Sequence, residues 1–155
     1  MLSFKGVGTR TFEVSRVNTI ETSLTPIGFK TPIEYGIDGS GFFKMHYLVA
    51  DQLEDNLRNL LQTNFGDRVS NFHYGANLQP LTTEYTSKDD FDQEAMVRIN
   101  TAVSTWMPFV ELVGFDSNPR FDSATHTGKI EIIIKYSIPR VQVFNKQMRI
   151  TLFVI

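Results

Sequence analysis

Residue types that commonly carry metal or acid–base chemistry are sparse and scattered in this chain. The three histidines, His46, His73 and His126, lie far apart, and none has an acidic neighbour at the spacing of a metal-binding motif. Asp122 precedes His126 by four residues, but in a Ser-, Thr- and Gly-containing stretch that we interpret as a loop. The absence of cysteine excludes zinc fingers, thiol nucleophiles and disulfide scaffolds. We predict no metal site and interpret the histidines as solvated or interface residues.

Nucleotide-binding and acyl-transfer motifs are also missing. The glycines between Gly36 and Gly41 have the wrong order for a dinucleotide loop, and the residues after them do not open a capped helix. No Gly-x-Ser-x-Gly motif is present, so an acyl-transfer enzyme has no support. We therefore predict no cofactor.

Paired carboxylates are harder to exclude, because a glycosidase needs only two acidic groups across a cleft. Among 17 acidic residues, Glu54, Asp67 and Glu84 lie nearest to a helix and loop that could form one. Glu54 is better explained as a helix-capping residue, and Asp67 as a local ion pair with Arg68. We predict no catalytic residues.

Length and charge fit one globular domain. The 155 residues carry 15 Lys and Arg against 17 Asp and Glu, and 41% of them are apolar, which is enough for a core. The near-neutral balance argues against a nucleic-acid binder. No signal-peptide stretch and no apolar run of about 20 residues is visible. We expect a soluble protein with neither nucleic-acid nor membrane partners.

Two amphipathic helices are predicted. The first begins at Asp51, with Glu54 completing an acidic capping box, and ends near Thr63 and Asn64. The second spans residues 88–106 and stops before Pro108. Their apolar stripes comprise Leu53, Leu57, Leu60 and Leu61 in the first, and Phe91, Ala95, Ile99, Ala102, Val103 and Trp106 in the second.

After Pro108, apolar residues recur at every second position, which is typical of strands. We predict strands at 109–115, closed by a turn at 116–119, and at 130–138 and 147–155, with a bulge or bend after Pro139. The alternating apolar residues are Ile130, Ile132, Ile134, Tyr136, Ile138, Met148, Ile150, Leu152 and Val154. The predicted fold is α+β, with two amphipathic helices packed on a small antiparallel sheet.

Residues 1–47 differ in amino-acid composition from the predicted α+β domain at 48–155. Six of the ten glycines and two of the six prolines lie there, and 11–17 could form a short strand. We interpret 1–47 as an extended N-terminal arm; a partly ordered tail is the alternative.

The last strand raises the question of an exposed sheet edge. An alternating strand at the end of the chain can leave an edge open, which invites pairing with another chain. The sequence alone is equally compatible with a simpler interpretation, in which the strand lies within a closed sheet.

Three stretches carry a family resemblance. They are 55–68, where a helix leads into Thr63-Asn64-Phe65-Gly66-Asp67-Arg68; Tyr74-Gly75 with Leu78; and the helix end from Ile99 to Pro108-Phe109-Val110. Together with the segment 41–45, they resemble the small baseplate wedge protein of contractile-tailed phages, the sheath initiator, which has a relative in type VI secretion baseplates. The first stretch is similar to the family's helix and Thr-x-x-Gly-Glu-Arg, with Asp67 in place of Glu.

The resemblance implies a non-enzymatic structural subunit of the virion's tail baseplate, assembled in the host cytoplasm. It implies docking on the helical core bundle of the larger wedge proteins through Asp67, Arg68, Trp106, Met107, Pro108 and Phe109. It also implies that the first ring of tail sheath protein extends a sheet whose strands carry Ile130, Ile132, Ile134, Met148, Arg149, Ile150, Leu152 and Val154. Other baseplate subunits would contact residues 1–47.

The chain departs from the family at the predicted docking turn. Met107 and Phe109 stand where the family has Glu and Arg, so an apolar contact would replace a charged one; core residues at a helix end are the alternative. Two other functions stay open. One is a cell-wall glycosidase, because the family has been described as lysozyme-like, and the other is the equivalent subunit of a bacterial secretion baseplate.

Overall fold

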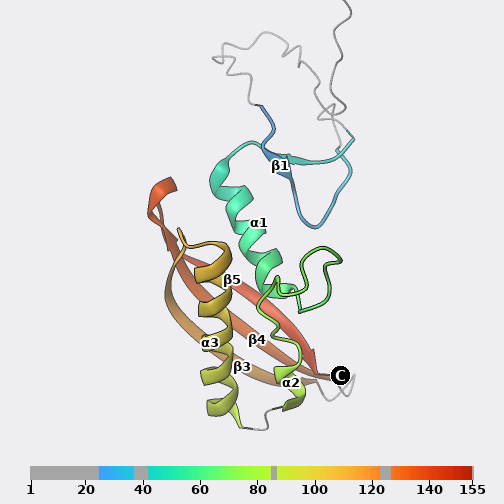
Figure 1. Ribbon diagram of the computed structural model, residues 1–155, viewed down its shortest axis with the longest axis vertical. Coiled ribbons are helices and arrows are strands. Elements are labelled where there is room, and N and C mark those ends of the chain that lie inside the picture. The colour runs from blue at the N-terminus through green and yellow to red at the C-terminus, as the bar shows by residue number, and fades with distance from the viewer. Residues whose placement is uncertain (1–24, 37–41, 85–86, 123–126, 155) are drawn as a thin grey trace, which may run out of the picture. The chain divides into compact units, whose positions relative to one another are not determined.

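The computed structural model describes residues 25–36, 42–84, 87–122 and 127–154 (Figure 1). The elements are β1 (Gly28–Phe29), β2 (Met45–His46), α1 (Val49–Gln62), α2 (Leu81–Glu84), α3 (Lys88–Trp106), β3 (Glu111–Asp122), β4 (Thr127–Ile138), a 3-10 turn (Pro139–Val141) and β5 (Val143–Val154). The chain divides into two compact units, Met1–Asp55 and Asn56–Ile155, with the boundary inside α1. The predicted α+β class is confirmed. The predicted strand at 11–17 lies outside the described residues.

The second unit is built on a three-stranded antiparallel sheet with the order β3-β4-β5. Its core face carries the predicted alternating residues, and seven of them are at most 5% exposed: Ile132, Ile134, Tyr136, Ile138, Met148, Ile150 and Leu152. Ile130 and Val154, at one end of the same face, are less buried. The period-two pattern therefore identified the core face correctly.

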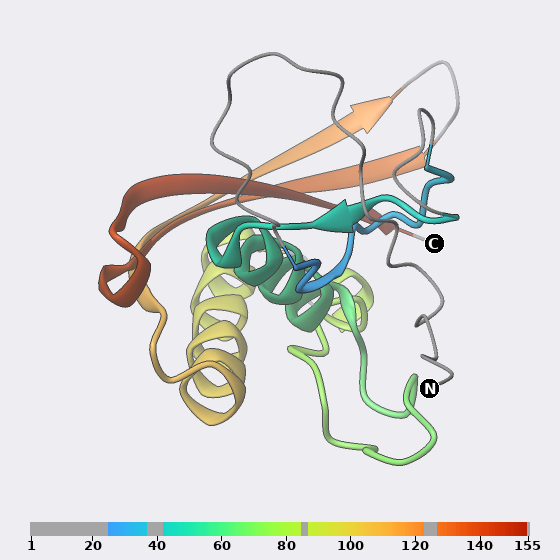
Figure 2. The same ribbon diagram turned by 90° about the horizontal axis from the view of Figure 1, so that it is seen from above.

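Helices cover that core face. Figure 2 shows α3 and the second half of α1 on the same side of the three-stranded sheet. The α3 stripe is buried at Phe91, Ala95, Ile99, Ala102 and Val103, and α1 buries Leu57, Leu60 and Leu61. The predicted bounds of α3 are confirmed.

Two details of the helix prediction are wrong. Trp106, assigned to the buried stripe, is 37% exposed, because it lies at the last residue of α3 and its ring contacts a surface tyrosine. Asp51 does not precede the helix: α1 begins at Val49, so Asp51 lies in the first turn. There its charge still favours the positive end of the helix dipole.

The predicted turn at 116–119 is also wrong. β3 continues to Asp122, and each residue from Gly114 onward has a partner on β4. The sequence Asp-Ser-Asn-Pro has the composition of a turn, but pairing with the isoleucine-rich β4 prevails over that local preference. The predicted irregularity near Pro139 is confirmed, because the β4–β5 register shifts between Tyr136 and Ile138 beside the 3-10 turn.

The first unit contains a short antiparallel ladder within the stretch interpreted as an arm. β1 pairs with β2, and an isolated bridge joins Tyr35 to Phe43. The rings of Phe29, Tyr35, Phe42 and Phe43 contact one another with centroids 4.7–6.3 Å apart. Edge-to-face aromatic pairs of this kind add to the stability that burial alone supplies.

A long loop connects α1 to α2 and depends on glycine at one position. Gly75 has a φ of +120°, and a Cβ placed there would lie 2.1 Å from the carbonyl oxygen of Thr63. The loop folds back on the helix end through bonds from Ala76 N to Leu60 O and from Asn77 N to Thr63 O. Only glycine permits this approach of the two backbone segments.

Gly75→Ala should therefore destabilise the second unit by at least about 2 kcal/mol, because the methyl group meets backbone rather than a mobile side chain. Urea unfolding followed by the fluorescence of Trp106, the single tryptophan, measures the loss. Gly114→Ala is the matched control, since its Cβ would lie an ordinary 3.7 Å from Lys135, and a change within about 0.5 kcal/mol is expected. Equal effects of the two substitutions would contradict this explanation.

Candidate functional site

Arg68, Tyr74 and Trp106 form a stack on the surface of the second unit. The Arg68 guanidinium carbon lies 3.9 Å from the Tyr74 ring centroid, and the Tyr74 and Trp106 rings are 5.2 Å apart at 60°. Through Tyr74, the structure brings together Arg68 and Trp106, which belong to the two segments that the resemblance assigned to one docking surface. We call these three residues the aromatic stack.

Asp67 has a local structural role beside this stack. Its Oδ2 accepts a hydrogen bond from the Asn64 backbone N–H at 2.8 Å, which closes the turn after α1. The expected ion pair with Arg68 is not formed: within the described part of the chain, Arg68 lies over Tyr74 instead. The Asp67 carboxylate is exposed beside the stack.

The turn after α3 divides its side chains between core and surface. Met107 N donates to Val103 O at 2.8 Å, and Val110 N donates to Met107 O at 2.9 Å. These bonds turn Met107 and Val110 inward, where each is 6% exposed. Pro108 is exposed and Phe109 is half-buried. The residues of the predicted apolar contact that present the most surface are thus Trp106 and Pro108.

Two observations show which backbone groups of β5 point away from the sheet. Gln79 Nε2 donates to the Phe153 carbonyl at 2.5 Å, so that carbonyl points away from β4. On the other edge, Pro119 pairs with Ile130 and has no N–H, which a strand accommodates where the N–H would face outward. Along an antiparallel strand, the N–H and C=O groups of successive residues point in alternate directions. The backbone groups of Ile130 therefore point to Leu152 of β5, and those of Phe153 point away from the sheet. The two observations agree.

The outward-facing backbone groups of β5 follow from this alternation. The β4–β5 register is continuous from Lys146 to Val154, so the N–H and C=O of Gln147, Arg149 and Thr151 point outward like those of Phe153. Among the described strands, β5 pairs with β4 alone. We call these groups the β5 edge; its last carbonyl is already bonded to Gln79.

Most side chains predicted to lie on sheath-facing strands belong to the core. Ile132, Ile134, Met148, Ile150 and Leu152 are buried beneath the helices, whereas Ile130 is half-buried and Arg149 and Val154 are exposed. A partner at this strand would therefore meet the backbone of β5 and exposed side chains such as those of Arg149 and Val154.

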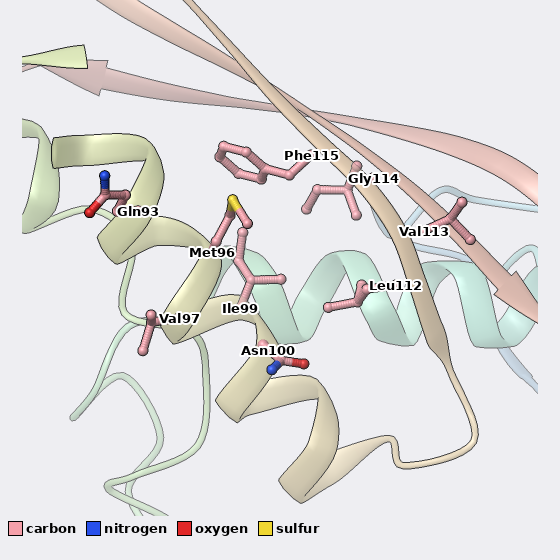
Figure 3. Close-up of a pocket in the computed structure, with 10 residues that line it drawn as sticks. Gln93, Met96, Val97, Ile99, Asn100, Leu112, Val113, Gly114 and Phe115 are labelled. Carbon is pink, nitrogen blue, oxygen red and sulfur yellow. The ribbon is translucent and has the colours of Figure 1, made fainter. Parts of the chain in front are cut away.

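A groove of about 530 Å³ lies between α3 and β3 (Figure 3). It is lined by Gln93, Met96, Val97, Ile99, Asn100, Leu112, Val113, Gly114, Phe115 and Ile134. No Asp, Glu or His stands among these residues, so the groove holds no pair of groups for acid–base hydrolysis. Of the carboxylates considered from the sequence, Glu84 contacts Arg98 at 3.3 Å and Asp67 closes a turn.

His46 and Asp55 form a largely buried titratable pair in the first unit. His46 Nε2 lies 2.6 Å from Asp55 Oδ2, and the Thr31 backbone N–H donates to the same oxygen at 2.8 Å. Burial raises the pKa of Asp55, but the hydrogen bonds from Thr31 and His46 outweigh it and hold the pKa below its ordinary value. The pair joins β2 to the middle of α1.

The other histidines do not converge on a site. The His73 ring lies 5.8 Å from Phe65 and 5.2 Å from Phe72, between ring centroids, and His126 is outside the described residues. In the described ranges, no three His, Asp or Glu side chains are placed to hold a metal ion. No helix in the same ranges is both long and apolar enough to cross a membrane.

Three features of these surfaces were not assigned from the sequence: Tyr74 as the link in the stack, Gln79 at the β5 edge, and the groove. Tyr74 was part of the resemblance only as an aromatic before glycine. Gln79 carries no sequence signal, because its bond to Phe153 joins residues 74 positions apart. Met96 and Val97, on the groove, fall outside the apolar stripe of α3.

Comparison with known proteins gives structural matches only. No protein-family model and no curated protein matches the chain. A chain in the baseplate of the anti-feeding prophage is similar with a TM-score of 0.58 and 17% identity, over 77% of this chain and 90% of that one. At this identity the similarity establishes a shared fold.

Two further structures give lower scores. A chain in the type VI secretion baseplate complex matches with a TM-score of 0.43 and 16% identity, over 69% of this chain and 94% of that one. A proposed tail lysozyme from Geobacter sulfurreducens matches with a TM-score of 0.49 and 18% identity, over 68% and 89%.

Asp55→Asn should destabilise the first unit by about 1–2 kcal/mol at neutral pH, because it removes the charge that accepts two hydrogen bonds. Since the pKa of Asp55 is lower folded than unfolded, its stabilisation is present above the unfolded value of about 3.9 and is lost as pH falls through the folded value. Protection of the Thr31 amide against hydrogen exchange measures this. The exposed Asp51→Asn is the control, and a difference that does not shrink as pH falls below the unfolded pKa would contradict the assignment.

Proposed function

We propose that this protein is a non-enzymatic subunit of a contractile-tail or secretion-type baseplate. In this role it docks on a larger baseplate protein through the aromatic stack and starts the sheath by adding a sheath strand to the β5 edge. The observation that carries the proposal is the β5 edge, a row of outward backbone groups on a regular strand. The fold shared with a chain of the anti-feeding prophage baseplate supports it.

The two edges of the sheet differ in their ability to accept another strand. β3 has a register shift between Leu112 and Gly114, and Pro119 offers no N–H at its outer edge. β5 has neither defect between Lys146 and Val154. Bulges and prolines protect edge strands from pairing with other chains. β3 is therefore protected from such pairing, and β5 can accept another strand.

The receptive segment is short and has a defined end. Within the described residues, the outward groups of Gln147, Arg149 and Thr151 have no backbone partner, while Gln79 already occupies the carbonyl of Phe153. A sheath strand added here would place alternate side chains beside Met148 and Ile150, extending the core face. Main-chain pairing would give affinity, and this apolar face would set the register.

The aromatic stack has the character of a docking surface for a helical partner. Arg and Trp are the residue types most enriched at energetically dominant contact positions. Trp106 is partly exposed, Pro108 lies next to it, and the adjoining loop exposes Phe65, Val69 and Phe72. The stacked guanidinium keeps its N–H groups for carboxylates of a partner while its plane lies on Tyr74.

Arg149→Pro should abolish sheath initiation while the protein still folds, because the lost N–H faces outward and serves no bond to β4. Negative-stain microscopy of assembled particles should show baseplates and tubes without sheath, and circular dichroism should show a folded protein. Arg149→Ala, which keeps the N–H, should seed sheath normally. Sheathed tails with the proline variant would refute pairing at this edge; failure of both variants would assign the effect to the side chain.

The double variant Arg68→Glu and Trp106→Ala should release the protein from baseplates, by at least about tenfold in incorporation, without unfolding it. Both side chains lie at the surface, so the loss would come from the contact itself. Phe109→Asp is the comparison: Phe109 is half-buried, and a folded variant that fails to incorporate would place it in the contact as well. Normal incorporation of the double variant, measured by immunoblot of purified particles, would contradict docking through the stack.

A further inference from the structure

The β5 edge carries positive charge and no negative charge. Met148, Ile150 and Leu152 are buried beneath the helices, so the alternate residues of β5 lie on the opposite face of the sheet, which we call the outer face. They include Arg149, at the centre of the β5 edge. Lys146, the other charged residue of β5, is also basic, and the strand contains no Asp or Glu.

The neighbouring strand adds positive charge to the outer face. Lys129 of β4 is the partner of Phe153, and its Nζ lies 5.7 Å from the Phe153 ring centroid. Lys135, further along β4, lies on the same face. The one acidic residue of β4, Glu131, contacts Arg120 of β3 at 3.5 Å. Its carboxylate is therefore engaged on the side of the sheet away from β5.

Arg149 has no carboxylate partner within the described residues. Ile133 is paired with Arg149 on one side and with Asp116 of β3 on the other, so it separates the two charges. Two strand spacings amount to roughly 10 Å, about one Debye length at physiological ionic strength. No ion pair joins Arg149 to another described residue. Its exposed guanidinium therefore lies beside the β5 edge without a neutralising charge.

A strand added to β5 would meet this charge directly. Its side chains would alternate between the core face, beside Met148 and Ile150, and the outer face, beside Arg149. Opposite charges on directly facing residues stabilise a pair of strands, and like charges destabilise it. The core face therefore favours apolar residues in the added strand, and the outer face favours an acidic one.

A second copy of this chain is a poor partner for the same edge. Antiparallel pairing of two β5 strands centred on Arg149 would place the two guanidinium groups opposite one another. In other registers the two strands would still bring only basic charges together, because β5 has no Asp or Glu. Basic residues on edge strands protect proteins from pairing with their own copies. Arg149 thus opposes self-pairing at the edge where it favours an acidic strand.

We propose that the β5 edge selects a strand in which apolar residues alternate with Asp or Glu, with an acidic side chain forming an ion pair with Arg149 on the outer face. This inference rests on the proposed function, because it names the partner of the same edge. Main-chain pairing supplies the affinity, and Arg149 and Lys129 decide between strands of opposite charge. Loss of the Arg149 charge leaves main-chain pairing intact, whereas its reversal changes which strand is preferred.

Two synthetic peptides of about nine residues, the length of the continuous β5 register, test this choice. Both have Val at alternate positions; one has Glu and the other Lys between them. Fluorescence anisotropy with the full chain should show the Glu peptide binding at least about fivefold more tightly, and the preference should shrink as salt rises. Arg149→Glu should abolish or reverse the preference. Arg149 is exposed, so this variant should fold, which circular dichroism checks.

Arg140→Glu is the matched control for the charge reversal. It makes the same change in the 3-10 turn before β5, roughly 20 Å along the strand from Arg149, which is well beyond the Debye length. The preference for the Glu peptide should be unchanged. An equal loss of preference in both variants would overturn the assignment to Arg149.

Gln147→Pro separates this inference from the proposed edge. It removes one outward N–H without changing a charge, so it should weaken both peptides by a similar factor. If it does so while the unmodified chain binds both peptides equally, the edge stands and the charge selection is overturned. A Glu preference that Gln147→Pro leaves untouched would mean adsorption to a basic surface, and would overturn the proposal. Absence of binding by either peptide at millimolar concentration would overturn the edge itself.

Discussion

The alternating direction of backbone groups in the three-stranded sheet is the constraint on which the other features depend. β4 has a neighbour on each side, so its residues direct their N–H and C=O groups in turn to β3 and to β5. That alternation places the missing N–H of Pro119 on the outer side of β3. It also turns the backbone groups of Gln147, Arg149 and Thr151 away from β4. The same two-residue period decides which β5 side chains enter the core. One register thus determines both the core and the exposed edge.

The sequence predicted the parts of this fold that depend on local periodicity. The isoleucine alternation of β4 and the spacing of Phe91, Ala95 and Ile99 identified the buried faces, because burial on one side of an element imposes its period. The same reasoning failed at 116–119, where turn-forming residues stand inside β3. Proline and aspartate are tolerated on an edge strand, and whether a strand lies at an edge is decided by pairing between distant segments.

The candidate surfaces show the same difference between what local spacing predicts and what only tertiary contacts reveal. Arg68 and Trp106 were singled out through the resemblance, yet only the fold shows that Tyr74 joins them into a stack. From the sequence, Met107 could not be told apart from an exposed contact residue. In the structure its side chain is buried, and its backbone N–H is bonded to Val103 O. Gln79 had no signal at all, because an amide side chain that caps a distant carbonyl looks like any other surface glutamine. Side-chain roles that depend on tertiary contacts are not encoded in spacing.

The three surfaces use different physical means, and this bears on how such a chain can diverge. In the proposed function the β5 edge would bind through main-chain groups, which every residue except proline supplies, so it would demand only alternation and the absence of Pro. The aromatic stack and the α3–β3 groove depend on particular side chains. A subunit whose central contact is made by backbone can change most of its residues and keep that contact. The fold shared with the anti-feeding prophage chain at 17% identity is compatible with such tolerance.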